Sequence, residues 1–241
     1  MSHCRCRIGF FRSAVLFAAA ASLVLSWGDN CVLSPPAHAT PGLLALTRET
    51  NDTIAKGLVV VRLEGAIEAP MAQGLNDIWY RLGPSHERLL IDLDSLGGDL
   101  LETEALIEVI ADIRQTADVD TLVRHDAKCA SACVAVFVQG AKRHAGSSST
   151  WMFHGACGRE TNLPSLGQTG RFLDILREAG VAPDFLRHLV DEGYVTTPGK
   201  LWVSGYELVH VYHANIITDL LQPWRPERPL GPLPYLMIDP H

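Results

Sequence analysis

Residues 88–116 read RLLIDLDSLGGDLLETEALIEVIADIRQT, and this stretch decides the fold. Its first part, Arg88 to Leu93, is an apolar run typical of a buried strand, and it leads into a predicted turn at Gly97-Gly98. From Leu100 to Thr116 the apolar residues recur at helical spacing on one face, while the glutamates lie mostly off that face. A strand, a glycine turn and an amphipathic helix in this order form the basic unit of an α/β fold.

The sequence on both sides of this stretch repeats the alternation of strands and helices. Strands are predicted at 57–63, 119–123 and 150–153, helices at 67–82 and 132–138, a surface loop at 155–168, and a helical region at 170–193 interrupted near Pro183. The pattern predicts an α/β fold with a mostly parallel sheet. In such sheets, functional groups gather at the carboxyl ends of strands and in the turns that follow them.

The first 39 residues have the three-part organisation of a secretory signal peptide. Arginines at the start precede an apolar run over residues 13–27, and Ala37-His38-Ala39 offers a small-x-small cleavage site. The run is short for a membrane span, although an uncleaved N-terminal anchor remains the alternative. We therefore expect a periplasmic or secreted protein, held at the inner membrane only if the leader stays uncleaved.

The rest of the chain is divided into three parts. Residues 40–57 are predicted as an irregular lead-in, residues 58–221 as one globular domain, and residues 222–241 as a tail in which six prolines prevent long helices or central strands. With 47% apolar and 20% charged residues, the chain can build a sizeable core. Its net charge of −7 and the lack of a basic stripe argue against nucleic-acid binding.

Cleavage after Ala39 leaves three of the six cysteines: Cys129, Cys133 and Cys157. An exported protein meets an oxidising compartment, which favours a disulfide among them. Two alternatives stay open, namely small buried thiols packed around a helix, and a metal site that includes His154. The chain has no paired CxxC or HxxxH spacing, so we predict neither a metal nor a cofactor.

Ser131 and His154 are a candidate nucleophile and a candidate base. Ser131 lies where a strand is expected to turn into the helix at 132–138, and the first N–H groups of that helix lack intrahelical partners. Such groups can stabilise developing negative charge. Each residue also has a structural interpretation, since serine is a common helix N-cap and a histidine at a strand end is often purely structural.

The order of the motifs resembles that of the proteolytic subunit of Clp-type serine proteases. Residues 59–68 resemble the opening strand and turn of that family, and residues 91–98 its strand into a Ser-Pro-Gly-Gly turn. Residues 129–133, 140–143 and 152–154 resemble its nucleophile helix, Gly-x-x-Arg loop and catalytic-histidine strand. The resemblance covers roughly residues 58–157, with a weaker echo over residues 202–219. It implies the ClpP/crotonase β-β-α superhelix, a homo-oligomer and a peptide or protein substrate.

Carried over to this chain, the resemblance makes Ser131 the nucleophile, His154 the general base, and the N–H groups of Gly98 and Ala132 the oxyanion hole. It also implies that an extended peptide pairs with the segment around residues 97–100. The family's third catalytic residue, an acid, would fall near Pro198-Gly199-Lys200, where none of the residues is acidic. Asp191, Glu192 and Glu207 are the acidic residues nearby in sequence.

Two functions follow from these observations. The first is an exported serine hydrolase, most simply a Clp-like peptidase that forms an acyl-enzyme on Ser131. The second is a catalytically weak or inactive binding or assembly protein of the cell envelope, which the missing acid and the proline-rich tail favour. Acyl-thioester chemistry, which the wider superfamily performs, ranks third because coenzyme A is a cytoplasmic cofactor.

Overall fold

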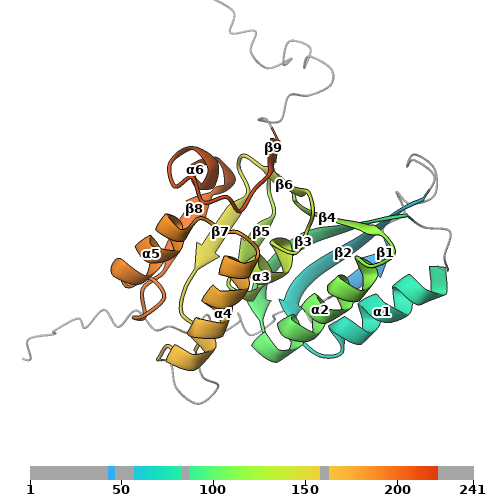
Figure 1. The fold of residues 1–241 in the computed structure, drawn as a ribbon, viewed down its shortest axis with the longest axis horizontal. Coiled ribbons are helices and arrows are strands. Elements are labelled where there is room, and N and C mark those ends of the chain that lie inside the picture. Colours follow the sequence, from blue (N-terminus) through green and yellow to red (C-terminus); the bar gives the residue numbers. More distant parts are fainter. Residues whose placement is uncertain (1–42, 47–56, 83–86, 158–162, 222–241) are drawn as a thin grey trace, which may run out of the picture.

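The computed structural model describes residues 43–46, 57–82, 87–157 and 163–221, in which strands and helices alternate along the chain (Figure 1). The strands are β1 (Leu43–Leu46), β2 (Leu58–Ile67), β3 (Arg88–Gly98), β4 (Asp118–Val123), β5 (Lys128–Ala130), β6 (Arg143–Gly146), β7 (Thr150–Phe153), β8 (Leu201–Ser204) and β9 (Asp219–Leu221). The helices are α1 (Met71–Leu82), α2 (Leu100–Ile113), α3 (Ala132–Phe137), α4 (Leu166–Glu178), α5 (Pro183–Asp191) and α6 (Gly205–His210). The predicted signal peptide and the proline-rich tail lie outside the described residues.

The sheet divides into two branches at β3, its longest strand. Along Arg88 to Asp92, β3 pairs in parallel with β4, and further along Ser95 pairs in parallel with Cys129 of β5. One branch continues through β6 and β9, and the other through β7 and β8. The pairings β1–β2 and β7–β8 are antiparallel and the others are parallel, so the mostly parallel α/β prediction is confirmed.

Helices α1 and α2 lie side by side against one face of the sheet (Figure 1). Residues of β2 and β3 that point to this face are fully buried, among them Val61, Leu63 and Ile91. Asp99 begins α2, because its carboxylate accepts a hydrogen bond from the Glu102 N–H, as an N-cap residue does. Burial of apolar side chains against these helices supplies the main stabilising free energy of this half of the domain.

The other half of the core surrounds β7 and α3. Trp151 packs edge-on against Phe137 with ring centroids 4.8 Å apart, and its Nε1 donates to Ser149 Oγ at 2.8 Å. The hydroxyl of Thr121 donates to the Phe137 carbonyl at 2.7 Å, which joins the end of α3 to β4. The buried rings and these two polar contacts fix α3 relative to both branches of the sheet.

Several predicted element boundaries were wrong. Gly97 and Gly98 do not form a turn but extend β3, which has one extra residue relative to β2 between Asp94 and Gly97, and β2 continues beside them as far as Ile67. A Cβ atom at Gly98 would lie 2.0 Å from the carbonyl oxygen of Ile67, so only glycine allows this close pairing. Since Ile67 belongs to β2, the first helix begins at Met71 instead.

Most of the short elements were not predicted. No range was predicted for β1, β6, β8, β9 or α6, and β5 was expected only as a strand of unspecified length before Ser131. These elements have three to six residues each, which is too few for a reliable apolar period. The loop predicted at 155–168 already contains the start of α4. Within the described residues, no helix combines the length and the apolar composition that a membrane span needs.

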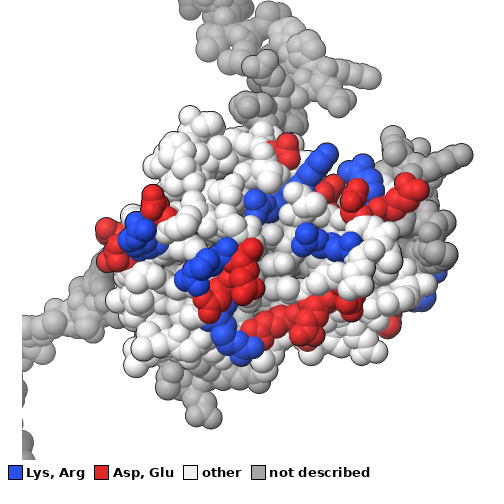
Figure 2. All heavy atoms as spheres, in the orientation of Figure 1, with Lys and Arg blue, Asp and Glu red and all other residues white. Residues whose placement is uncertain are grey.

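Surface charges on the face shown in Figure 2 are mixed in sign, with acidic side chains gathered over α2. One of the acidic residues of α2 forms an ion pair with a cation on a neighbouring helix. Arg171 of α4 reaches across to Glu104 of α2. Inside the sheet, Asp92 is fully buried and accepts from Arg62 at 2.9 Å and from Arg124 at 2.8 Å. These pairs connect β2, β3 and the residue after β4.

Candidate active site

Ser131 occupies a strained position between β5 and α3. Its backbone torsions are φ 55° and ψ −125°, a conformation that residues other than glycine rarely adopt. Holding a serine there costs about 1–3 kcal/mol, so the surroundings must enforce it. Strain of this kind is concentrated at functional sites, where it aims a side chain in a particular direction.

Three serines of the described residues stand at helix N-cap positions, and Ser131 differs from the other two. Ser165 and Ser204 have extended backbones, and their side chains accept hydrogen bonds from Gln168 N and Glu207 N. The Ser131 side chain makes no capping hydrogen bond. The interpretation of Ser131 as a simple N-cap is therefore not supported, and its hydroxyl is left available for another purpose.

The pairing of β5 with β7 brings Ser131 and His154 to the same edge of the sheet. Ala130 faces Met152 in a parallel register, and the Ser131 N–H donates to the Met152 carbonyl at 2.8 Å. His154 follows two residues later, directly after the end of β7. No hydrogen bond joins Ser131 Oγ to the imidazole in this structure; in substrate-free enzymes this contact is often long and tightens only with substrate.

His154 is half-buried, and its Nδ1 atom is buried without a hydrogen-bond partner. Burial lowers the pKa of the imidazole below its usual value, and the positive charge of Lys200 lowers it further. The backbone carbonyl of Gly155 acts in the opposite direction, although no well-formed hydrogen bond reaches Nδ1. At neutral pH the ring is therefore uncharged and can accept a proton.

The three acidic residues near the expected third position do not orient His154. Glu207 is engaged in the capping box of α6, where its carboxylate accepts from both N and Oγ of Ser204. These hydrogen bonds lower the pKa of the Glu207 carboxyl. Asp191 and Glu192 are exposed at the end of α5, and neither forms a hydrogen bond with the imidazole. Among the described residues, no acidic side chain therefore forms a hydrogen bond with Nδ1 of His154.

Gly97 and Gly98 lie against the Ser131 turn. A Cβ atom built on Gly97 would be 2.9 Å from Ser131 Cβ and 3.0 Å from Ala132 N, so the glycine backbone directly contacts the turn. The Asp99 N–H donates to Ile67 on the β2 side. The Gly97 N–H donates to Ser95 Oγ at 3.0 Å, so neither of these two N–H groups is directed at Ser131.

The N–H of Ala132 is a candidate donor at this turn. It is the first residue of α3, so this N–H has no acceptor inside the helix. Gly98 follows directly after Gly97, which packs on Ser131 and Ala132, so both residues assigned to the oxyanion hole by the resemblance lie at the same turn. Two backbone N–H donors are what an oxyanion hole requires.

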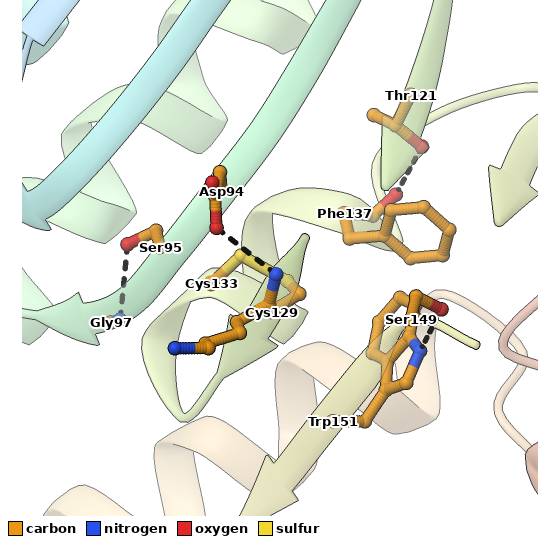
Figure 3. The surroundings of a disulfide bond; sticks show 10 residues. Asp94, Ser95, Gly97, Thr121, Cys129, Cys133, Phe137, Ser149 and Trp151 are labelled. Atoms are coloured by element: carbon orange, nitrogen blue, oxygen red, sulfur yellow. Dashed lines mark hydrogen bonds between the residues drawn. A yellow bond between two sulfur atoms is a disulfide. The ribbon is translucent and has the colours of Figure 1, made fainter. Parts of the chain in front are cut away.

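A disulfide between Cys129 and Cys133 brackets Ser131 (Figure 3). Its Cα atoms are 5.2 Å apart, and both side chains are fully buried. Cys157 is not a member of this pair. The strand end is also tied to β3, because the Lys128 N–H donates to Asp94 Oδ1 at 3.0 Å. The disulfide and this hydrogen bond restrain both sides of the strained turn.

The sequence predicts Ser131, His154, Gly98 and Ala132 as site residues, and the structure places Gly97-Gly98 against the turn at Ser131. Two contributions were not predicted, namely the packing of Gly97 on that turn and the effect of Lys200 on His154. The apolar segment Leu201-Trp202-Val203 could have revealed the position of Lys200. This segment forms β8, and its pairing with β7 determines which residues come near His154.

Comparisons with known proteins show which known fold the protein resembles. Neither the protein-family models nor the curated protein sequences that we compared with the chain match it. Among solved structures, an asparagine-to-aspartate mutant of ClpP1 from Listeria monocytogenes is similar, with a TM-score of 0.54. The sequences are 17% identical, and the match covers 68% of this chain and 91% of the Listeria chain. The protein therefore has a ClpP-like α/β fold with a curled, mostly parallel sheet.

Proposed function

We propose that the protein is an exported serine hydrolase, a Clp-like peptidase in which Ser131 forms an acyl-enzyme and His154 serves as the general base. The observation that carries the proposal is the conformation of Ser131. It alone among the three N-cap serines of the described residues has a positive φ and an uncommitted side chain. The ClpP-like fold supports the same reading.

The proposed reaction gives each of these groups one role. Ser131 Oγ attacks the carbonyl carbon of the substrate while His154 Nε2 takes the hydroxyl proton. The N–H groups of Gly98 and Ala132 donate to the oxygen that becomes negative. The imidazolium then protonates the leaving amine, and a water molecule, deprotonated by the same imidazole, hydrolyses the acyl-enzyme.

The environment of His154 predicts a slow enzyme. A general base must be unprotonated at the working pH to accept a proton. The lowered pKa of His154 keeps its ring unprotonated at neutral pH. However, no carboxylate among the described residues holds Nδ1–H or stabilises the imidazolium. In serine proteases, loss of the acid's contribution costs about 10⁴-fold in turnover, while the oxyanion hole and substrate binding preserve part of the rate enhancement.

Export, peptide substrates and self-association belong to the proposal as well. The leader predicted over residues 1–39 supports a periplasmic or secreted location, and the oxidised pair Cys129–Cys133 fits an oxidising compartment. A peptide can pair with the edge of β3 near Gly98 by strand addition. We further propose a homo-oligomer, in keeping with the family that the sequence resembles.

A serine-reactive fluorophosphonate probe tests the nucleophile. We expect wild-type protein to be labelled and the Ser131→Ala variant to remain unlabelled, with both melting at similar temperatures. Ser204→Ala is the matched control, because it removes a serine hydroxyl at another helix N-cap and should not reduce labelling. Equal labelling of wild type and Ser131→Ala would refute the assignment.

A second function, binding without catalysis, has one specific observation in its favour. The buried, unpartnered Nδ1 of His154 leaves the base without the group that normally orients it. A protein that only binds partners would need the fold and a binding surface, but it would not need a working nucleophile and base. Partners retained from the native envelope by both wild type and Ser131→Ala, together with no labelling of either, would favour this function.

A further inference from the structure

His154 and Lys200 are the residues just beyond the end of the β7–β8 pairing. Strands β7 and β8 are antiparallel, and their last pair is Phe153 opposite Leu201. Because antiparallel partners run in opposite directions, the next residues on the two segments are His154 and Lys200. Lys200 directly precedes β8 and is half-buried. Its ammonium group is close enough to disfavour a positive charge on the imidazole.

This lysine belongs to the segment in which the resemblance leads us to expect an orienting acid. The buried Nδ1 atom of His154 has no hydrogen-bond partner, and the chain segment beside it, Pro198-Gly199-Lys200, contributes a cation and no carboxylate. A carboxylate there would stabilise the imidazolium that forms during attack. A cation has the opposite effect, because like charges repel each other, and they do so more strongly in a partly buried site than in water.

We infer that Lys200 is a positioning residue of the proposed acyl-transfer site, which keeps His154 unprotonated under mildly acidic conditions and opposes its protonation in the transition state. The inference rests on the proposed function and deepens it. Lys200 would lower the turnover rate at neutral pH. In return, His154 would stay unprotonated, and able to act as a base, when the surroundings become acidic. The site would then resemble a serine–histidine pair tuned by a cation, without a third acid.

The other charged groups near His154 in the sequence do not lower the pKa of its imidazole. Asp191 and Glu192 lie exposed at the end of α5, and Glu207 of α6 is held by Ser204. All three are acidic and would raise, not lower, the tendency of the ring to take a proton. Among the described residues, Lys200 is thus the charged group that acts on the imidazole in this direction.

The test follows the titration of the His154 ring by NMR in the full protein without substrate. Lys200→Met and Lys200→Glu remove and reverse the charge, Lys200→Arg keeps it, and the His154→Gln spectrum assigns the signal. Lys142→Met is the matched control, because it removes an exposed lysine charge beside β6 that does not act on His154. Melting curves check that each variant is folded.

We expect the titration midpoint to move to higher pH in Lys200→Met and further in Lys200→Glu, and to stay near wild type in Lys200→Arg and Lys142→Met. Fluorophosphonate labelling of Lys200→Met should be roughly three- to tenfold faster at pH 8 and fall off at a higher pH than in wild type.

Unchanged midpoints in folded Lys200→Met and Lys200→Glu would overturn the inference, while labelling of Ser131 in wild type would leave the proposed function standing. Shifted midpoints without any labelling of wild type would instead overturn the proposed function and, with it, the catalytic role of Lys200.

Discussion

Replacement of Gly97 by alanine should disturb both the stability of the fold and the reactivity of Ser131. Gly97 has φ +92°, a conformation that costs an L-residue about 1–2 kcal/mol. Its new Cβ would also lie 2.7 Å from the Ala130 carbonyl oxygen and 2.9 Å from Ser131 Cβ. Overpacking of this kind typically costs about 1–3 kcal/mol. The two effects together predict a loss of about 2–5 kcal/mol in the free energy of unfolding.

A loss of this size is easy to measure, because a domain is stable by only about 5–15 kcal/mol in total. Thermal unfolding followed by circular dichroism should show Tm lowered by roughly 5–15 °C. Labelling by the fluorophosphonate should slow as well, since the added methyl group displaces the nucleophile turn.

Gly170→Ala is the control for the alanine itself. Gly170 lies within α4, and a Cβ atom there would meet nothing within 4 Å. This variant should be more stable than wild type by about 0.5–1 kcal/mol, because alanine favours the helix over glycine. If Gly97→Ala melted at the wild-type temperature and labelled at the wild-type rate, the close packing of β3 against the Ser131 turn would be refuted.

The remaining predictions concern the same turn and its base. Ser131→Gly should raise the free energy of unfolding by about 1 kcal/mol relative to Ser131→Ala, because glycine adopts φ 55° without strain; calorimetry showing no gain would argue against a strained turn. Cys129→Ala with Cys133→Ala should lower stability in urea by about 2 kcal/mol and slow labelling, and unchanged values would mean that the disulfide does not restrain the turn. The lowered pKa of His154 means that the unfolded chain binds the proton more readily, so stability should fall as pH drops below the ordinary histidine value of 6.5. His154→Gln should lose less stability between pH 7.5 and pH 5.5 in urea titrations, and an equal loss would contradict a depressed pKa.

The sequence predicted the long elements well because each carries its own periodic pattern. The helix expected over residues 100–116 is α2, Leu100–Ile113, and the strands expected near residues 57–63 and 119–123 are β2 and β4. Their apolar faces are wide enough to specify one orientation on the sheet. The signal peptide and the tail lie outside the described residues and stay predictions.

The short strands could not be predicted because their stability comes from neighbours. Strand β5 has three residues, and it forms because β3 and β7 supply hydrogen bonds on both sides. The same holds for β8, whose pairing with β7 brings the segment that contains Lys200 to the end of β7, which is next to His154 in the sequence. Only the register reveals that proximity, and register is a property of two segments far apart in the sequence.

The residues of the candidate site could be predicted from the sequence, but their geometry could not. Ser131, His154 and Gly98 could be named from motif order, yet nothing local indicates that Ser131 has a positive φ while Ser165 and Ser204 are ordinary caps. That difference arises from the packing of Gly97 on the turn and from the hydrogen bond between Ser131 N and Met152 O.

The most direct test of the account is the detection of an acyl-enzyme on Ser131. The protein would be mixed with an activated ester such as a p-nitrophenyl ester, and the product burst, the intact mass and the modified peptide would be measured. We predict one acyl group per chain on Ser131, none in Ser131→Ala, and formation slowed by about 10²–10⁴-fold in His154→Gln. Absence of a burst in wild type, or acylation that persists unchanged in Ser131→Ala, would contradict the claim that Ser131 and His154 form an acyl-transfer site.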